Sequence, residues 1–213
     1  MAGIDLDTMR GLVRRDLRDE DPADERWSDD ELDRHIGRAL DELSLAAPLE
    51  TSTTLTTSAG SRDLDVSSLA ERVAIDAVEF PTGEYPPSLV SFSLWGDTLT
   101  MDLEGVPSGG QDVIVRWART HTLDGSGSTL PAALEDLVAT GAAAYAALEW
   151  SSYATNRLNV GGADTWSHFH TWAQERLAAF HKALAKHGRQ RRLRSRRLFV
   201  PAGGALGARP LGE

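Results

Sequence analysis

Histidines gather in the C-terminal third of the chain, where they could hold a metal ion. Ser167-His168-Phe169-His170 lies within a run of helical periodicity, and Glu175, His181 and His187 follow it. Residues spaced by two on a helix point about 200° apart, whereas histidines spaced by four share a face and can bind one zinc ion. The spacing therefore favours solvated histidines on a helix surface, and we expect no metal and no cofactor.

Carboxylates are the second group of residues that could perform catalysis, as the general acid and base of a hydrolase. Seven acids lie close together in the sequence: Asp19, Glu20, Asp21, Asp24, Glu25, Asp29 and Asp30. A catalytic pair needs two carboxyl groups held across a cleft with different pKa values, and nothing in the sequence separates these seven. Acids are favoured at helix starts, so caps and a solvated linker explain them. Nucleotide-binding and nucleophile-elbow motifs are also absent, and we expect no enzyme.

Positive charge is concentrated at the C-terminal end of an otherwise acidic chain. The formal net charge is −10, yet residues 182–197 carry eight Lys or Arg and no acid. Arginines alternate there with apolar residues, and the candidate partner-binding residues are Arg191, Arg192, Leu193, Arg194, Arg196, Arg197, Leu198, Phe199 and Val200. This end could bind nucleic acid, solubilise the chain, or fold onto a protein partner. The apolar residues favour a protein partner, because a contact with phosphates alone needs no apolar anchors.

The composition is that of one globular protein with an insert. The chain has 213 residues, of which 41% are hydrophobic and 25% charged. No run of about 18 apolar residues occurs, and the start MAGIDLDTMR lacks the features of a signal peptide. We therefore expect a soluble protein made in a cytosol. The absence of cysteine excludes disulfides, thiolate nucleophiles and cysteine-based metal sites.

Hydrophobic periodicity divides the chain into helical ends and a β-rich middle. It predicts a hairpin of two helices, the first from Leu6 and the second from a capping box at Ser28 and Glu31. Between residues 49 and 123 the period changes to two, which predicts an antiparallel sheet with Gly96-Asp97 as a hairpin turn. A third helix is predicted over 131–156, and a fourth from Asp164 to a C-cap at Gly188.

The expected fold is α+β, with a mainly α-helical four-helix core. That core comprises residues 1–48 and 129–188, the inserted small antiparallel β domain residues 49–128, and an extended basic tail residues 189–213. A run of small side chains from Gly141 to Ala144 predicts close packing of another helix. Trp172 does not lie on the predicted apolar face of its helix, so it could contact another subunit. Candidate residues for a subunit interface are therefore Trp172, Gly141 and Ala142.

The order of these parts resembles the head–tail adaptor (connector) proteins of tailed bacteriophages. The resemblance rests on the sequence Trp27-Ser28-Asp29-Asp30-Glu31-Leu32, on a helix start from Leu130 to Leu137, and on the small-residue run that ends at Ala146. It covers residues 4–47 and 129–200 and leaves the β insert unmatched.

The resemblance implies a structural virion protein at the head–tail junction. Such a protein forms a twelve-fold ring on the portal protein, reaches the portal with its C-terminal segment, and meets a downstream tail or head-completion protein. DNA passes through the central channel without specific binding, and an acidic channel wall would repel the duplex. No membrane is involved. The alternative is a nucleic-acid-binding accessory protein that acts through its basic C-terminal tail, because only that end carries concentrated positive charge.

Overall fold

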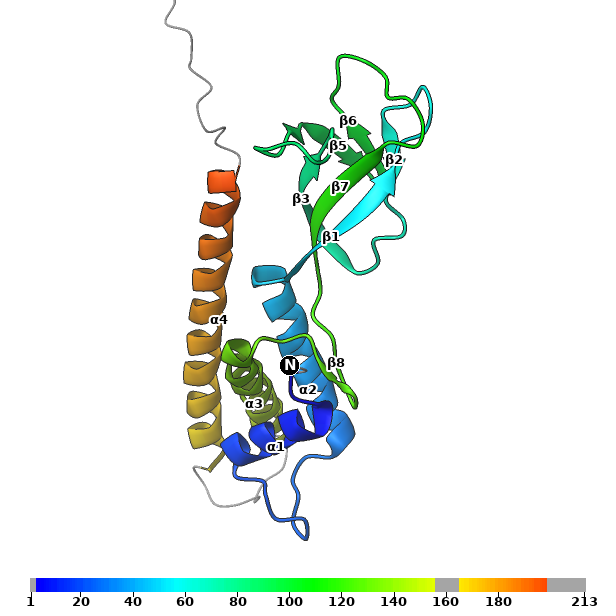
Figure 1. Ribbon diagram of the computed structural model, residues 1–213. Coiled ribbons are helices and arrows are strands. Elements are labelled where there is room, and N and C mark those ends of the chain that lie inside the picture. The colour runs from blue at the N-terminus through cyan, green and yellow to red at the C-terminus, as the bar shows by residue number, and fades with distance from the viewer. Residues whose placement is uncertain (1–2, 156–164, 199–213) are drawn as a thin grey trace, which may run out of the picture.

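The computed structural model describes residues 3–155 and 165–198, which form four α-helices and nine β-strands (Figure 1). The helices come from the two ends of the chain, and the strands lie between the second and third helices. The protein is therefore α+β. The prediction of a mainly α-helical four-helix core was wrong, because the strands form three sheets and enclose a hydrophobic core of their own.

The first helix begins at a cap formed by Asp5, and the second begins at the capping box that the sequence predicts. In α1 (Leu6–Leu17) the Asp5 carboxylate accepts the Thr8 N–H at 2.8 Å. In α2 (Asp29–Ala46) the Ser28 hydroxyl accepts the Glu31 N–H, and the Glu31 carboxylate accepts the Ser28 N–H. Each cap satisfies an N–H group that has no partner within the helix, which fixes where the helix begins.

The third and fourth helices approach closely because Gly141 has no side chain at their contact. A Cβ atom at position 141 of α3 (Ala132–Thr155) would lie 2.9 Å from the Phe180 ring of α4 (Thr165–Leu198). Gly141, Ala142 and Phe180 are all buried within the chain. Gly141 and Ala142 therefore serve the packing of the chain's own helices, and they offer no surface to a second subunit as the interface prediction required.

Helix α4 is longer than the sequence predicts. It continues past Gly188 to Leu198, and Gly188 does not adopt the positive φ of a glycine C-cap. The arginines, glutamine and leucine that follow are good helix formers, so the helix propagates through this position. The prediction of an extended tail was wrong for residues 189–198. None of the helices in the described ranges combines the length and the apolar character that a membrane span requires.

Nine strands form the insert between α2 and α3. Their bounds are β1 (Leu49–Thr56), β2 (Asp63–Asp65), β3 (Arg72–Glu79), β4 (Leu89–Val90), β5 (Phe92–Trp95), β6 (Thr98–Met101), β7 (Asp112–Arg119), β8 (Leu123–Asp124) and β9 (Gly127–Ser128). The sheet orders are β1-β7-β3-β4, β2-β6-β5 and β8-β9, and every pairing is antiparallel. The predicted antiparallel sheet and the turn at Gly96-Asp97, between β5 and β6, are confirmed.

Two separate hydrophobic clusters hold the described residues together. The first draws side chains from all four helices, including Met9, Leu43 and Phe180. The second lies among the strands and includes Leu99 and Val115. The chain passes between the two parts at Leu49 and Arg119, which face each other in the β1–β7 ladder. The division at residues 48 and 129 into independent domains stays a prediction.

Candidate functional site

The C-terminal half of α4 carries an exposed positive face. Lys182, Lys186 and Arg189 are exposed and recur at spacings of four and three, so they share one side of the helix. Within the described residues none of the three side chains has a hydrogen bond or an ion pair. No acid occurs in α4 after Glu175. We call Lys182, Lys186 and Arg189 the basic face, and it is open to an anionic partner.

Arg191 belongs to another side of the helix and is already engaged within the chain. Its Nη2 donates to both carboxylate oxygens of Asp76 on β3, at 2.7 and 2.8 Å. The two side chains are 22% and 25% exposed, so solvent screens this ion pair less than one on the open surface. The pair fastens α4 to the β insert, and it occupies an arginine that the sequence assigned to a partner.

The other predicted tail residues divide between helix and undescribed chain. The backbone from Arg192 to Leu198, which also includes Leu193, Arg194, Arg196 and Arg197, forms the last turns of α4. Phe199 and Val200 lie outside the described residues.

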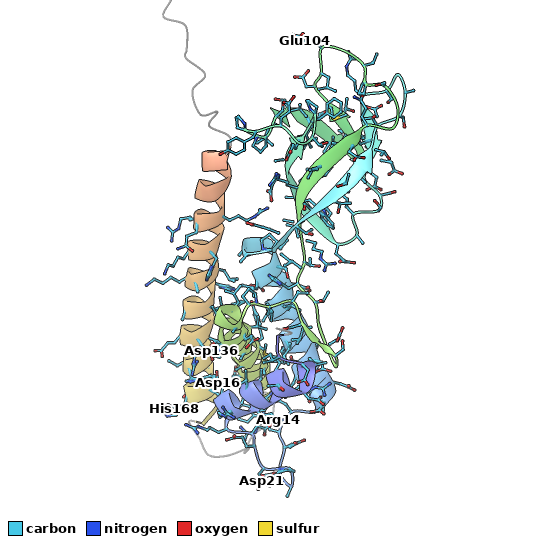
Figure 2. The ribbon with its side chains drawn as sticks, in the orientation of Figure 1. Arg14, Asp16, Asp21, Glu104, Asp136 and His168 are labelled. Atoms are coloured by element: carbon cyan, nitrogen blue, oxygen red, sulfur yellow. The ribbon has the colours of Figure 1, made fainter. Side chains whose placement is uncertain are left out.

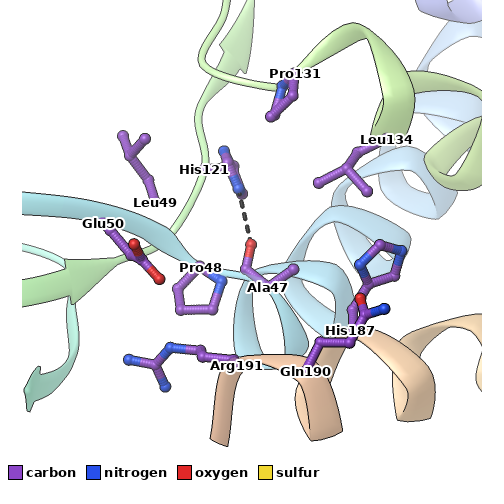
Figure 3. Close-up of a pocket in the computed structure, with 10 residues that line it drawn as sticks. All are labelled: Ala47, Pro48, Leu49, Glu50, His121, Pro131, Leu134, His187, Gln190 and Arg191. Carbon is purple, nitrogen blue, oxygen red and sulfur yellow. Dashed lines mark hydrogen bonds between the residues drawn. The ribbon is translucent and has the colours of Figure 1, made fainter. Parts of the chain in front are cut away.

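A groove adjoins the end of α4, at the junction of the helices with the insert (Figure 3). Its volume is about 620 Å³, and it is lined by Ala47, Pro48, Leu49, Glu50, His121, Pro131, Leu134, His187, Gln190 and Arg191. Figure 3 shows His187, Gln190 and Arg191 reaching it from α4, opposite the segment where α2 passes into β1. The groove therefore depends on the position of α4 against the junction.

His121 ties this junction together. The Ala47 carbonyl oxygen lies 2.9 Å from its Nε2 and can only accept, so Nε2 carries a proton and donates it (Figure 3). Its Nδ1 lies 3.1 Å from the Thr129 hydroxyl, and its backbone N–H donates to Ser44 Oγ at 3.0 Å. Sequence reasoning did not single out His121. Its partners in α2 are more than seventy residues away along the chain, so no local pattern marks it.

Two of the histidines considered as metal ligands, His170 and His181, take part in separate contacts between helices. Nδ1 of His170 lies 3.3 Å from Ser151 Oγ, and Nε2 of His181 lies 3.2 Å from Glu42 Oε2. Across residues 3–155 and 165–198 no three His, Asp or Glu side chains gather as metal ligands. Tyr145 donates to Glu42 at 2.6 Å, and burial together with this carboxylate raises the pKa of Tyr145 to about 12. Its phenol therefore stays protonated at neutral pH and is not an activated nucleophile.

The acidic cluster is organised around Arg14. Its Nη1 donates to Asp19 Oδ2 and its Nη2 to Asp29 Oδ1, each at 2.8 Å. The hydrogen bond from Arg14 is the main cause that lowers the pKa of the Asp29 carboxyl below its usual range. Asp19 and Asp29 thus share a cation instead of facing each other across a cleft. This arrangement joins α1 to the start of α2 and is structural.

Trp172, the third candidate for a subunit interface, is half-buried at a second pocket. This pocket has a volume of about 550 Å³ and lies between the end of α1 and the beginning of α4. The Arg176 guanidinium carbon lies 5.1 Å from the centroid of the Trp172 ring. Trp172 therefore keeps part of its surface available to a partner.

Neither a protein-family model nor a curated protein sequence matches this chain.

Proposed function

We propose that the protein is a ring-forming head–tail adaptor of the virion, which docks on the portal protein through the C-terminal half of α4 and extends the DNA channel to the tail. The basic face is the observation that carries this proposal. Lys182, Lys186 and Arg189 present unpaired positive charge on a molecule of net charge −10. Complementary charge steers two partners together and fixes their relative position.

A helix suits this role better than the extended tail that the sequence predicts. Phe180 of α4 packs against Gly141 of α3, and Arg191 of α4 pairs with Asp76 of β3. These two contacts hold α4 in place before any partner binds. A preordered surface loses less conformational entropy on binding than a disordered segment does. Each subunit then contributes a modest contact, and a ring of subunits makes the joint firm by avidity.

The remaining charge and the insert fit the other roles of an adaptor. Residues 1–50 carry fifteen acids and seven bases, and an acidic channel wall would repel the DNA duplex and let it pass. On the insert, Tyr85 is 98% exposed and Trp95 is 89% exposed. Exposed aromatic side chains are typical anchors in protein interfaces, and in this proposal they face the downstream tail or head-completion protein.

The test neutralises the basic face. Lys182→Gln, Lys186→Gln and Arg189→Gln in one chain should abolish binding to the portal protein of the same phage, as measured by surface plasmon resonance, with circular dichroism unchanged. Arg191→Gln is the matched control on the same helix, because that guanidinium is engaged with Asp76. It should lower stability and leave portal binding nearly intact. A triple variant that binds the portal as the parent does contradicts the proposal.

The same charges support the alternative of a nucleic-acid-binding accessory protein. Phosphate contacts weaken steeply with salt, in proportion to the number of cations involved. If the triple variant binds the portal normally but loses affinity for duplex DNA, and that affinity falls with salt in the parent, this alternative replaces the adaptor.

A further inference from the structure

The pocket between α1 and α4 combines an aromatic wall with positive charge. Phe169 and Trp172 line it from α4, and Arg176 stacks over the Trp172 ring. Asp16 is the single acid among the described residues that line it, and it lies 3.5 Å from Arg176. Arg15, Arg18 and His168 add further cationic or titratable groups. The pocket is thus a basic site with an apolar wall on an acidic protein.

Arg18 is held in an unusual backbone conformation at this pocket. It forms the C-cap of α1 with φ 59°, and its N–H bonds to the Arg14 and Arg15 carbonyl oxygens. Glycine is the usual residue there, because any side chain is strained at positive φ. Within the described residues the Arg18 guanidinium has neither an ion pair nor a hydrogen bond. A strained arginine with an open charge indicates that its side chain serves a binding role.

An acidic loop with fixed ends lies at the same end of the molecule. Asp19 is buried, and its Oδ1 accepts the Arg26 N–H at 2.7 Å, which closes the base of loop 20–25. The Arg26 guanidinium carbon lies 4.4 Å from the centroid of the Trp150 ring. Figure 2 shows Asp21 at the far end of this loop, in the part of the molecule that also holds Asp16 and His168.

The acids of this loop face solvent. Glu20, Asp21, Asp24 and Glu25 are exposed, and the Asp24 carboxylate has no partner within the described residues. Arg15 and Glu20 approach to 3.8 Å within the chain, but their side chains are 66% and 56% exposed. Such a pair adds little to stability, so both groups remain available to another molecule.

We propose that the acidic loop 20–25 of one copy enters the basic pocket of a neighbouring copy, and that this is the repeating contact of the ring. The inference rests on the proposed ring-forming function and identifies its subunit interface. Loop and pocket are two different surfaces, so successive contacts between them join copies head to tail, as a closed ring requires, whereas a reciprocal pair of such contacts would close as a dimer. Their opposite charges select this pairing over contacts between two loops or two pockets.

A charge exchange between two variants tests the interface with the full chain. Arg18→Glu places a carboxylate in the pocket opposite the acidic loop, and Asp24→Lys places an ammonium group on the loop opposite the pocket arginines. Each variant alone should stay monomeric in sedimentation velocity at concentrations where the parent assembles, with its melting temperature unchanged. An equimolar mixture should assemble again, because every contact in an alternating ring then pairs opposite charges at positions 24 and 18. Assembly of the parent should weaken as salt is raised.

Several results would overturn the interface. These are a parent that remains monomeric at its highest soluble concentration, single variants that assemble as the parent does, and a mixture that fails to recover. A loss of duplex DNA binding by Arg18→Glu without a change in assembly would make the pocket a phosphate site instead.

The readouts separate this interface from the adaptor function. Portal binding that persists while the charge exchange fails rejects the interface alone. A charge exchange that succeeds without any portal binding rejects the adaptor function and leaves the interface standing.

Discussion

His121 connects three parts of the chain through one side chain and one backbone group. It contacts the end of α2 at Ser44 and Ala47 and the approach to α3 at Thr129. These partners are positioned for a ring with two nitrogens at opposite ends, which no aliphatic side chain supplies. The junction of helices and insert therefore depends on a buried polar network rather than on apolar packing alone.

Replacement of His121 should destabilise the whole protein. His121→Ala leaves the Ala47 carbonyl and the Thr129 hydroxyl without this partner, which should lower the free energy of unfolding by about 2–3 kcal/mol. Urea unfolding followed by tryptophan fluorescence measures the change. His168→Ala, at an exposed position, should change it by less than about 0.5 kcal/mol. Equal effects of the two substitutions would contradict the role given to His121.

Gly141 offers a sharper test of helix packing. A methyl group at this position would overlap the Phe180 ring, so Gly141→Ala should destabilise by about 1–3 kcal/mol even though alanine favours helix. Gly37 in α2 is the matched control, because nothing lies within 4 Å of a Cβ atom there. Gly37→Ala should stabilise by about 0.5–1 kcal/mol. Thermal unfolding measures the stability of both variants. Stabilisation by Gly141→Ala would show that α3 and α4 can move apart to accept the methyl group.

His35 should make stability depend on pH. Burial lowers the pKa of its imidazole, and this outweighs the opposite effect of Glu149. The unfolded chain then takes up a proton near pH 6.5 that the folded protein does not, so stability should fall as the pH drops below that value. In His35→Gln the loss of unfolding free energy between pH 7.5 and 5.5 should be smaller than in the parent, by at most about 1.4 kcal/mol per pH unit. Urea unfolding at the two pH values checks this, and an equal loss of stability in the parent and in His35→Gln would contradict it.

At the scale of elements, α4 is fastened to the insert by the Arg191–Asp76 pair. Both side chains are less than a third exposed, and one Nη2 reaches both carboxylate oxygens. A double-mutant cycle with Arg191→Ala and Asp76→Ala should give a coupling free energy of about 0.5–2 kcal/mol, measured by urea unfolding. Simple additivity of the two substitutions would mean that the pair does not hold helix and sheet together.

At the scale of the molecule, the insert should be removable. Leu49 and Arg119 are paired across β1 and β7, so an Asn-Gly turn can join them once residues 50–118 are deleted. The shortened chain keeps the residues of the helical cluster and should give the far-UV circular dichroism of a folded helical protein, with a lower melting temperature because the Arg191–Asp76 pair is lost. An unfolded product would show that helices and strands form one cooperative unit.

Local signals account for much of the secondary structure. The starts of α1 and α2 follow from Asp5 and from the Ser28–Glu31 capping box, because these hydrogen bonds join residues three apart. The alternation of apolar with other residues indicated the strands, and Gly96-Asp97 indicated a turn. These patterns also involve only residues close together in the sequence. The same kind of local rule was wrong at Gly188, where good helix formers follow the glycine and the helix continues.

The sequence by itself determined where most elements begin, the change of period between helices and strands, and the separation of an acidic body from a basic end. Only the tertiary structure decided that the strands build a second core, that the Phe180 ring packs against Gly141 within the chain, and that Arg191 is bound to Asp76. It also brought the acidic loop and the basic pocket to one end of the molecule. Caps, turns and periodicity act between near neighbours and are therefore visible in a single sequence. Burial and ion pairing join residues as much as 160 positions apart, and their partners are set only when the chain folds.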